Sequence, residues 1–212
     1  LYITCEMAEE KIAERIDANL LDIPIQQLQD PLLTKQKYRA KMDVLKKKTQ
    51  GKLVIKEYPT ASAHVGHFKA LLNELSLKKG FHPEIIFVDY LNICASSRYK
   101  GTIVNSYTYV KAIAEELRGL AGEYNVPILS ATQTTRSGYG NSNVEITDTS
   151  ESFGLPATAD LMFALISTED MEGLNQIMVK QLKNRYNDPT VYKRFVLGID
   201  RQKMRLYDCE QG

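Results

Sequence analysis

The sequence is poor in cysteine, carries almost no net charge and has no long apolar run. Its three cysteines, Cys5, Cys94 and Cys209, are scattered and form no Cys-x-x-Cys pair, which excludes a disulfide framework and favours a reducing cytosol. Because the net charge is +1, any contact with nucleic acid must come from local clusters of cations. No apolar run approaches the roughly 18 residues that cross a bilayer, and no signal peptide is recognisable, so we expect no membrane partner.

Little precedes the first expected element. The chain has no initiator methionine or leading loop and opens at residues 1–4 with the pattern of a buried strand, so we interpret it as a piece of a longer protein. Its 212 residues, 43% hydrophobic and 25% charged, fit one large domain with a substantial core. No internal repeat or domain boundary is recognisable, and we expect one domain over residues 1–212, truncated at its N-terminus.

Strand and helix patterns alternate along most of the chain. Apolar strands are expected at residues 1–4, 53–55, 84–89, 126–130 and 161–166. One of the helices between them is expected to begin at Thr34 and to point Tyr38, Met42 and Leu45 inward. This order predicts an α/β fold with a mostly parallel, twisted sheet flanked by helices. An antiparallel hairpin extension is expected at the C-terminal end, with strands at 176–185, 191–199 and 205–207.

Three polar side chains follow three of the expected strands. Glu6 follows the first strand, Asp89 ends the strongest one, and Gln133 follows the strand before a long polar segment. In an open parallel sheet the ligand crevice lies beyond the carboxyl ends of the strands. A carboxylate there suits Mg²⁺, a second carboxylate can activate water, and an amide can sense a γ-phosphate. Taken singly, each residue also fits a turn, a helix start or a surface amide; together they predict a nucleotide site.

One part that such a site requires is missing from the sequence. No Gly-x-x-x-x-Gly-Lys-Ser/Thr phosphate loop occurs, because the pair Gly51-Lys52 continues into Leu53 and lacks the upstream glycine. The phosphate loop therefore lies outside this chain, or there is none. His64 and His67 have the spacing of a metal-binding pair on a helix, but no further histidine or cysteine stands at ligand spacing, so we expect no metal there.

Several segments resemble motifs of the DnaB-type replicative DNA helicases, in that family's order. They are residues 1–7 (LYITCEM), 86–91 (IFVDYL), 130–136 (SATQTTR), 150–160 (SESFGLPATAD) and 183–185 (KNR). Finer details, such as MAEE at 7–10 and VKAIAEELR at 110–118, are similar to the helicases of T-even-type bacteriophages. The resemblance covers nearly the whole chain. Its departures are Thr132, where the family usually has serine, and the missing front end.

The resemblance implies a RecA-like ATPase domain that uses ATP and Mg²⁺ to drive 5′–3′ unwinding of duplex DNA at the replication fork. It implies Glu6 as the base that activates water, Asp89 as the residue that holds Mg²⁺ through its hydration shell, and Gln133 as the γ-phosphate sensor. In this family the phosphate loop precedes the strand that ends at the catalytic glutamate. A cut just before Leu1 would remove it, and the isolated chain is then expected to be inactive.

The resemblance further implies that Lys183 and Arg185 act as fingers, cations that reach the ATP bound to a neighbouring subunit. Residues two apart on a strand share a face, which fits a shared role, and a finger of this kind can be worth roughly 10³ or more in rate. The alternative is a solvated hairpin tip, where lysine and arginine are common.

The family implies a homo-hexameric ring that threads single-stranded DNA, with a primase and a helicase loader as partners, in the cytoplasm of a bacterium or of a phage-infected host. Residues 96–101 and 136–143 mix cations with small residues, as sequence-neutral phosphate binding requires. Arg98, Lys100 and Arg136 are the candidate DNA contacts. For Arg98 and Lys100, a plain surface loop fits equally well.

Two other interpretations remain open at this point. A RecA-like or KaiC-like ATPase of recombination or of a clock would share the carboxylates at the strand ends. A catalytically silent DNA-binding or ring-interface module would explain the missing phosphate loop. The KNR and SES segments favour the helicase, and a phosphate loop within a few dozen residues upstream of Leu1 would decide for a motor.

Overall fold

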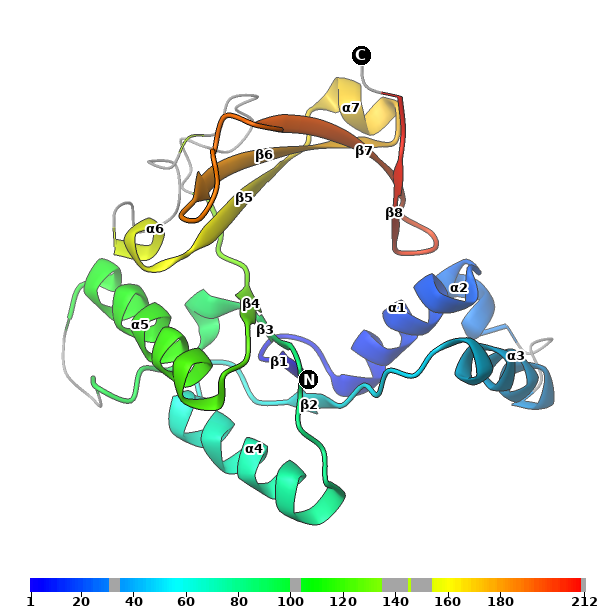
Figure 1. The fold of residues 1–212 in the computed structure, drawn as a ribbon. Coiled ribbons are helices and arrows are strands. Elements are labelled where there is room, and N and C mark those ends of the chain that lie inside the picture. Colours follow the sequence, from blue (N-terminus) through cyan, green and yellow to red (C-terminus); the bar gives the residue numbers. More distant parts are fainter. Residues whose placement is uncertain (31–34, 100–103, 135–144, 146–153, 211–212) are drawn as a thin grey trace.

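The structure is a computed structural model that describes residues 1–30, 35–99, 104–134, 145 and 154–210 (Figure 1). It contains two four-stranded sheets. The parallel sheet has the order β2-β1-β3-β4, with the strands β1 Tyr2–Thr4, β2 Ile55–Glu57, β3 Ile86–Asp89 and β4 Ile128–Ser130. The antiparallel sheet has the order β5-β6-β7-β8, with the strands β5 Leu161–Ile166, β6 Gln176–Asn184, β7 Arg194–Asp200 and β8 Arg205–Asp208. The predicted α/β class, the parallel sheet and the antiparallel extension are confirmed.

The longer helices accompany the parallel sheet. They are α1 Glu9–Leu21, α3 Lys35–Lys48, α4 Val65–Lys79 and α5 Ser106–Tyr124. The shorter ones are α2 Ile25–Leu28, the 3₁₀ turn η1 Leu91–Ile93, α6 Gly154–Thr158 and α7 Glu169–Gly173. No helix among these described segments is long and apolar enough to span a membrane.

The core lies between the parallel sheet and the helices α4 and α5. Ile3, Ile86 and Val88 are at most 2% exposed. They pack in one cluster with the apolar face of α4, where Phe68 is 1% exposed, and with that of α5. Burying an apolar side chain of this size contributes roughly 1.5–3 kcal/mol, so this cluster fixes the strands that carry the candidate site.

Local signals set the ends of the two core helices. The side chain of Asn105 accepts a hydrogen bond from Thr108 N–H over 2.8 Å at the start of α5. Gly80, with φ of +56°, ends α4 in the left-handed conformation that glycine adopts without a steric penalty. Asn125 ends α5 with φ of +50°. These caps define the ends of α4 and α5, and α5 connects the neighbouring parallel strands β3 and β4.

Two expectations about buried faces were wrong in part. No residue of α3 is buried, and Tyr38, Met42 and Leu45 are only half-covered. The helix lies at the outer edge of the molecule (Figure 1), held to α1 by a hydrogen bond of 2.5 Å from the Tyr38 hydroxyl to Asp17 Oδ2. The expected buried strand at 161–166 belongs to the antiparallel sheet, where its alternate residue Leu165 is 66% exposed.

The turn between β7 and β8 returns to the far end of α1 (Figure 1). Ile25 N–H donates to the Gln202 carbonyl over 2.8 Å. Asp22 Oδ1 accepts from Lys203 Nζ over 3.2 Å and from Arg205 Nη1 over 3.0 Å. The antiparallel sheet is therefore tied to the parallel half at residues far apart in the sequence.

Candidate functional site

Asp89 lies at the carboxyl end of the interior strand β3, at the edge of the parallel sheet that is formed by the carboxyl ends of its strands. The hydroxyl of Tyr2 on β1 donates a hydrogen bond to Asp89 Oδ2 over 2.8 Å. The Tyr2 ring stacks on Phe87 with the ring centroids 6.0 Å apart. Burial, with the hydrogen bond to Asp89, raises the pKa of Tyr2 above its ordinary value, so its hydroxyl remains a donor well into the alkaline range. A neighbouring strand thus fixes this carboxylate in a rigid frame.

Glu6 stands in the loop that leaves β1, and two threonine hydroxyls hold the backbone beside it. Thr4 Oγ1 accepts from Met7 N–H over 3.0 Å and donates to the Met7 carbonyl over 2.8 Å. Thr60 Oγ1 donates to the Cys5 carbonyl over 2.8 Å. The side chain of Glu6 is exposed. The anchored loop therefore presents an exposed carboxylate just beyond the carboxyl end of β1.

Gln133 follows β4 and is joined to the segment after Asp89. Its Nε2 donates to the Tyr90 hydroxyl over 3.0 Å. Beside it, Thr132 Oγ1 donates to Asn92 Oδ1 over 2.7 Å. Because Tyr90 directly follows Asp89, these bonds connect the end of β4 to the end of β3. Thr132 stands where the resembling family usually has serine, and it keeps the hydroxyl group that donates this hydrogen bond.

The parallel sheet brings these three residues to one edge. Thr4 of β1 stands opposite Asp89, and Val88 stands opposite Ser130 of β4, so the strands end at nearly the same level. Glu6, Asp89 and Gln133 consequently leave the sheet on the same side. Their common position was predicted from the sequence, whereas their chemical roles stay predictions.

A pair of free thiols lies directly behind this edge. Cys5 and Cys94, both buried, approach with 3.9 Å between their sulfur atoms. The hydrogen bond with Cys5 and burial raise the pKa of Cys94, which keeps that thiol protonated at neutral pH. Sequence analysis treated these cysteines as scattered, because 89 positions separate them. The contact follows from the pairing of β1 with β3.

The candidate fingers lie where β6 ends beside α6. Lys183 Nζ donates to the carbonyl of Pro156 over 2.6 Å. Arg185 Nη2 donates to the carbonyl of Ala157 over 3.0 Å, and its Nη1 lies 3.1 Å from Asp160 Oδ1. Burial and the nearby Arg185 lower the pKa of Lys183. Both cations therefore rest against the C-terminal carbonyls of a short helix.

A third cation, which sequence analysis missed, belongs to the same group. Arg118 on α5 places Nη1 2.8 Å from Asp160 Oδ1 and 2.8 Å from the Thr158 carbonyl. Its hydrogen bond is the main cause that holds the pKa of Asp160 below the usual range. In the sequence, Arg118 drew notice only as the last residue of the VKAIAEELR segment at 110–118, and nothing in that pattern indicated this contact.

The two groups of candidate residues do not meet. Among the residues that the structure describes, no hydrogen bond or ion pair joins Lys183 or Arg185 to Glu6, Asp89 or Gln133. Within the described residues of one chain, the two groups are therefore not linked by direct polar contacts.

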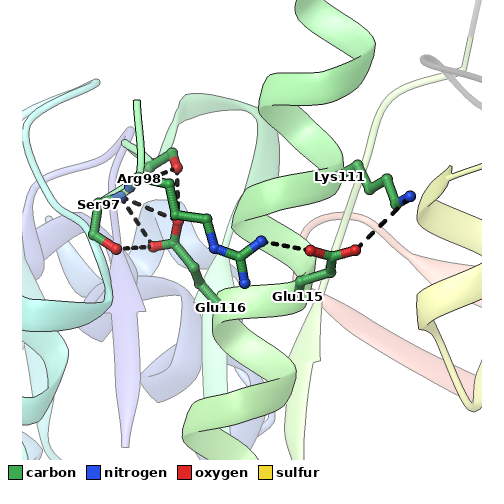
Figure 2. A network of polar contacts seen from close by, with 6 residues as sticks. Ser97, Arg98, Lys111, Glu115 and Glu116 are labelled. Carbon is green, nitrogen blue, oxygen red and sulfur yellow. Dashed lines mark hydrogen bonds and ion pairs between the residues drawn. The ribbon is translucent and has the colours of Figure 1, made fainter. Parts of the chain in front are cut away.

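The candidate DNA contact Arg98 sits in a polar network with α5 (Figure 2). Its Nη1 lies 2.5 Å from Glu115 Oε2, and Lys111 approaches the same carboxylate from the other side at 3.9 Å. The hydrogen bond to Glu115 raises the pKa of Arg98. The structure therefore places Arg98 in a surface ion pair. The other two candidate contacts, Lys100 and Arg136, lie outside the described residues.

The backbone before Arg98 is held by a buried carboxylate. Glu116, which is 8% exposed, accepts hydrogen bonds from Ser96 Oγ at 2.6 Å, from Ser97 Oγ at 2.7 Å and from Ser97 N–H at 3.0 Å. Burial raises its pKa, but these hydrogen bonds outweigh burial and leave the pKa below the usual range. The 96–98 segment is thus anchored to α5 by a charged acceptor.

Comparison with known proteins places these features in a family. The sequence profile described as "DnaB-like helicase C terminal domain" matches residues 1–194. A "DnaB-like replicative helicase" of Enterobacteria phage T4 is 45% identical over all 212 residues, which cover 45% of that protein. The chain thus spans about half the length of this curated relative.

Two solved structures share the fold. One is described as the structure of a DnaB-like replicative helicase and its interactions with primase, and it matches with a TM-score of 0.76 at 16% identity, over 99% of this chain and 50% of that one. The other is described as an ATPase domain and also gives 0.76 at 17% identity, over 99% of this chain and 74% of that one. Both confirm the RecA-like arrangement that was predicted.

Proposed function

Because the chain belongs to the DnaB-like helicase C-terminal domain family, we propose that it is most of the motor domain of a ring-shaped replicative helicase. In this proposal the full-length protein hydrolyses ATP and unwinds duplex DNA in the 5′–3′ direction at the replication fork. The observation that carries the proposal is the common sheet edge of Glu6, Asp89 and Gln133, with an anchored loop under Glu6.

The residues at this edge suit an ATP site with Mg²⁺. Asp89 offers hard carboxylate oxygens at the carboxyl end of β3. Mg²⁺ prefers such oxygens, commonly keeps several waters and binds through one or two carboxylates plus substrate phosphates. When bound, the ion neutralises charge on the phosphates. Asp89 would hold its shell, Glu6 would take the proton of the attacking water, and Gln133 would bond the γ-phosphate.

The phosphate loop that such a site requires is not in this sequence. We therefore expect the 212-residue chain alone to bind ATP poorly and to hydrolyse it at background rate. If the full-length protein also failed to hydrolyse ATP, this chain would instead be a DNA-binding or ring-interface module.

Lys183 and Arg185 are proposed to act in trans, on ATP held by the neighbouring subunit. Within one chain both cations contact α6 and the link that follows it rather than Glu6, Asp89 or Gln133, which supports this role. A homo-hexameric ring would bring the two groups together at each interface. Guanidinium and ammonium groups placed there would stabilise charge that develops on the γ-phosphate.

Single-stranded DNA, a primase and a helicase loader are the proposed partners of the full-length protein. Arg98 is proposed as a DNA contact, in which case a phosphate must compete with Glu115 for its guanidinium. Lys100 and Arg136 are proposed to act with it. The similarity to a phage protein makes the cytoplasm of an infected bacterium the proposed place of action.

The decisive experiment compares Glu6→Gln with Glu10→Gln in the full-length protein. The amide that replaces the Glu6 carboxylate keeps the size of the side chain but cannot accept a proton, so turnover should vanish while ATP still binds. Glu10 is an exposed acidic residue in the first turn of the helix that follows and provides the matched control, which should keep nearly full turnover. Equal turnover of both variants would reduce Glu6 to a helix-start residue.

Subunit mixing tests the trans role of Arg185. Arg185→Ala and Glu6→Gln proteins should each be inactive alone, and mixed rings should regain part of the ATPase rate. Some interfaces then pair an intact Glu6 with an intact Arg185 of the neighbour. If native mass spectrometry shows mixed rings that remain inactive, the trans assignment is wrong.

A further inference from the structure

One carboxylate oxygen binds two arginines that come from different parts of the fold. Asp160, in the link between α6 and β5, receives Arg185 Nη1 at 3.1 Å and Arg118 Nη1 at 2.8 Å on the same Oδ1. Arg185 lies just beyond β6, and Arg118 lies on α5. The three side chains are only partly exposed, at 37–44%. This is a structured cluster rather than a pair of free surface charges.

The restraint on Arg185 is unusually complete for a residue just beyond the end of a strand. Its backbone N–H donates to the Asp160 carbonyl over 2.9 Å. Its Nη1 meets the Asp160 carboxylate, and its Nη2 donates to the Ala157 carbonyl over 3.0 Å. Long cationic side chains lose much rotamer freedom when they are ordered. Because Arg185 is already ordered, it loses little further rotamer freedom when it binds an anion.

The charge balance leaves Arg185 available to an anion. Among the described residues, Arg118 and Arg185 share the carboxylate of Asp160 and Lys183 bonds to carbonyls beside them, so the cluster keeps an excess of positive charge. Arg118 lies nearer to Asp160 than Arg185 does, so the one negative charge of Asp160 is divided between the two guanidinium groups. A guanidinium has five N–H donors, and the two contacts from Nη1 and Nη2 leave others to bind a phosphate.

We propose that Asp160 is a positioning residue that sets the direction of Arg185, and that Arg118 holds Asp160 in place. The proposal rests on the finger role of Arg185 stated above and extends it to two residues that touch no nucleotide. Within each subunit, α5 would thereby orient the side chain that completes the site of the neighbour.

The primary test is Asp160→Asn in the full-length protein. The amide keeps the shape but loses the charge that aligns Arg185, so kcat for ATP should fall about 10-fold or more, since a misplacement of about 1 Å can cost roughly 10²-fold. The KM for ATP should stay within about twofold. Arg118→Gln should act in the same direction, and the double variant should be little worse than Asp160→Asn alone.

Asp22→Asn is the matched control. Asp22 also binds two cations through a single oxygen, Lys203 and Arg205, and its left-handed backbone with φ of +53° is one that asparagine tolerates. It lies at the end of α1 and away from the proposed fingers. The ATPase turnover of Asp22→Asn should remain near wild type. A loss of turnover in Asp160→Asn alone would then be specific to Asp160 and not a general result of removing a carboxylate that binds two cations.

A mixing experiment distinguishes positioning from simple structural damage. Asp160→Asn subunits should regain ATPase activity when mixed with Glu6→Gln subunits, because the lesion then affects only the neighbour's site. A subunit damaged as a whole would also spoil its own site and give no recovery. If Arg185→Ala recovers with Glu6→Gln while Asp160→Asn does not, or if Asp160→Asn keeps full turnover alone, the positioning role is refuted. Failure of the Arg185→Ala mixture would refute the finger role itself.

Discussion

Replacing Glu116 by glutamine tests whether the buried carboxylate anchors the segment that carries Arg98. Glutamine has nearly the same shape, but it is neutral and presents two N–H donors where the carboxylate accepts bonds from two hydroxyls and one backbone N–H. The serine hydroxyls can rotate to accept, whereas the N–H of Ser97 cannot. The variant therefore turns charge-assisted hydrogen bonds into neutral ones. The NH₂ group of the glutamine can also face the N–H of Ser97, which leaves that donor without an acceptor.

The magnitude follows from the number and type of these bonds. A hydrogen bond to a charged group contributes about 1.5–3 kcal/mol and a neutral one about 1 kcal/mol. Weakening two or three bonds at a site that is 8% exposed should lower the free energy of unfolding by about 2 kcal/mol. For a domain of this size, that corresponds to a Tm lower by about 4–8 °C.

The assay compares urea and thermal unfolding of Glu116→Gln with those of Glu115→Gln. Glu115, the adjacent residue on α5, forms only partly exposed ion pairs with Arg98 and Lys111 (Figure 2). Such pairs contribute at most about 1 kcal/mol, so the control should lose distinctly less stability. Equal losses in the two variants would show that the buried carboxylate is not the anchor.

The pH dependence gives an independent check with a definite sign. The pKa of Glu116 is lower in the folded protein than its ordinary value of 4.5. The stabilisation is therefore fully present above about that value and is lost as the pH falls through the folded pKa. The stability difference between wild type and Glu116→Gln should accordingly be constant near neutral pH and narrow below about pH 4.5. A difference that stayed unchanged into acid would contradict this account.

Two further variants test other contacts. Thr60→Val removes the hydroxyl that holds the Cys5 carbonyl beside Glu6; a net hydrogen bond of about 0.5–1.5 kcal/mol predicts a kcat for ATP roughly 2- to 10-fold lower in the full-length protein. Thr60→Ser should restore the rate, and a valine variant as fast as wild type would exclude this anchor. Gly198→Ala would place a methyl group into the ring of Tyr207, its partner on β8, and should lower the free energy of unfolding by about 1–3 kcal/mol. Adding Tyr207→Ala should recover most of that loss, and thermal unfolding of the single and double variants measures both effects.

Much of the fold could be predicted because the decisive signals are local. Apolar residues three and four apart run along α4 and α5, and those that define the pattern, such as Phe68 and Ile113, are buried. The edge that carries Asp89 followed from one general rule about parallel sheets. These features depend on periodicity and chain order, which a single sequence displays directly.

The rest depends on contacts between distant residues, which periodicity does not encode. The approach of Cys5 to Cys94 and the pairing of Arg118 with Asp160 arise only when separate elements pack. Lys180 on β6 is 1% exposed and pairs with Glu145 at 2.7 Å, although a lysine in a strand pattern predicts a solvent-facing position. The prediction for α3 was wrong in the opposite direction: its apolar residues are half-covered, and a half-covered apolar stripe has the same spacing as a buried one.

The sheet order has a consequence for how the chain acquires its structure. β1 lies between β2 and β3, so both of its edges are paired, and Tyr2 has partners at Ile55 and Phe87. Both partners are synthesised long after β1 itself, because α1, α2 and α3 come before either of them in the chain. During translation β1 must therefore wait as an unpaired apolar segment, exposed to aggregation or chaperones, and the sheet forms late through long-range closure. Late formation of this sheet is the expected result of placing β1 between two strands that both follow it in the chain.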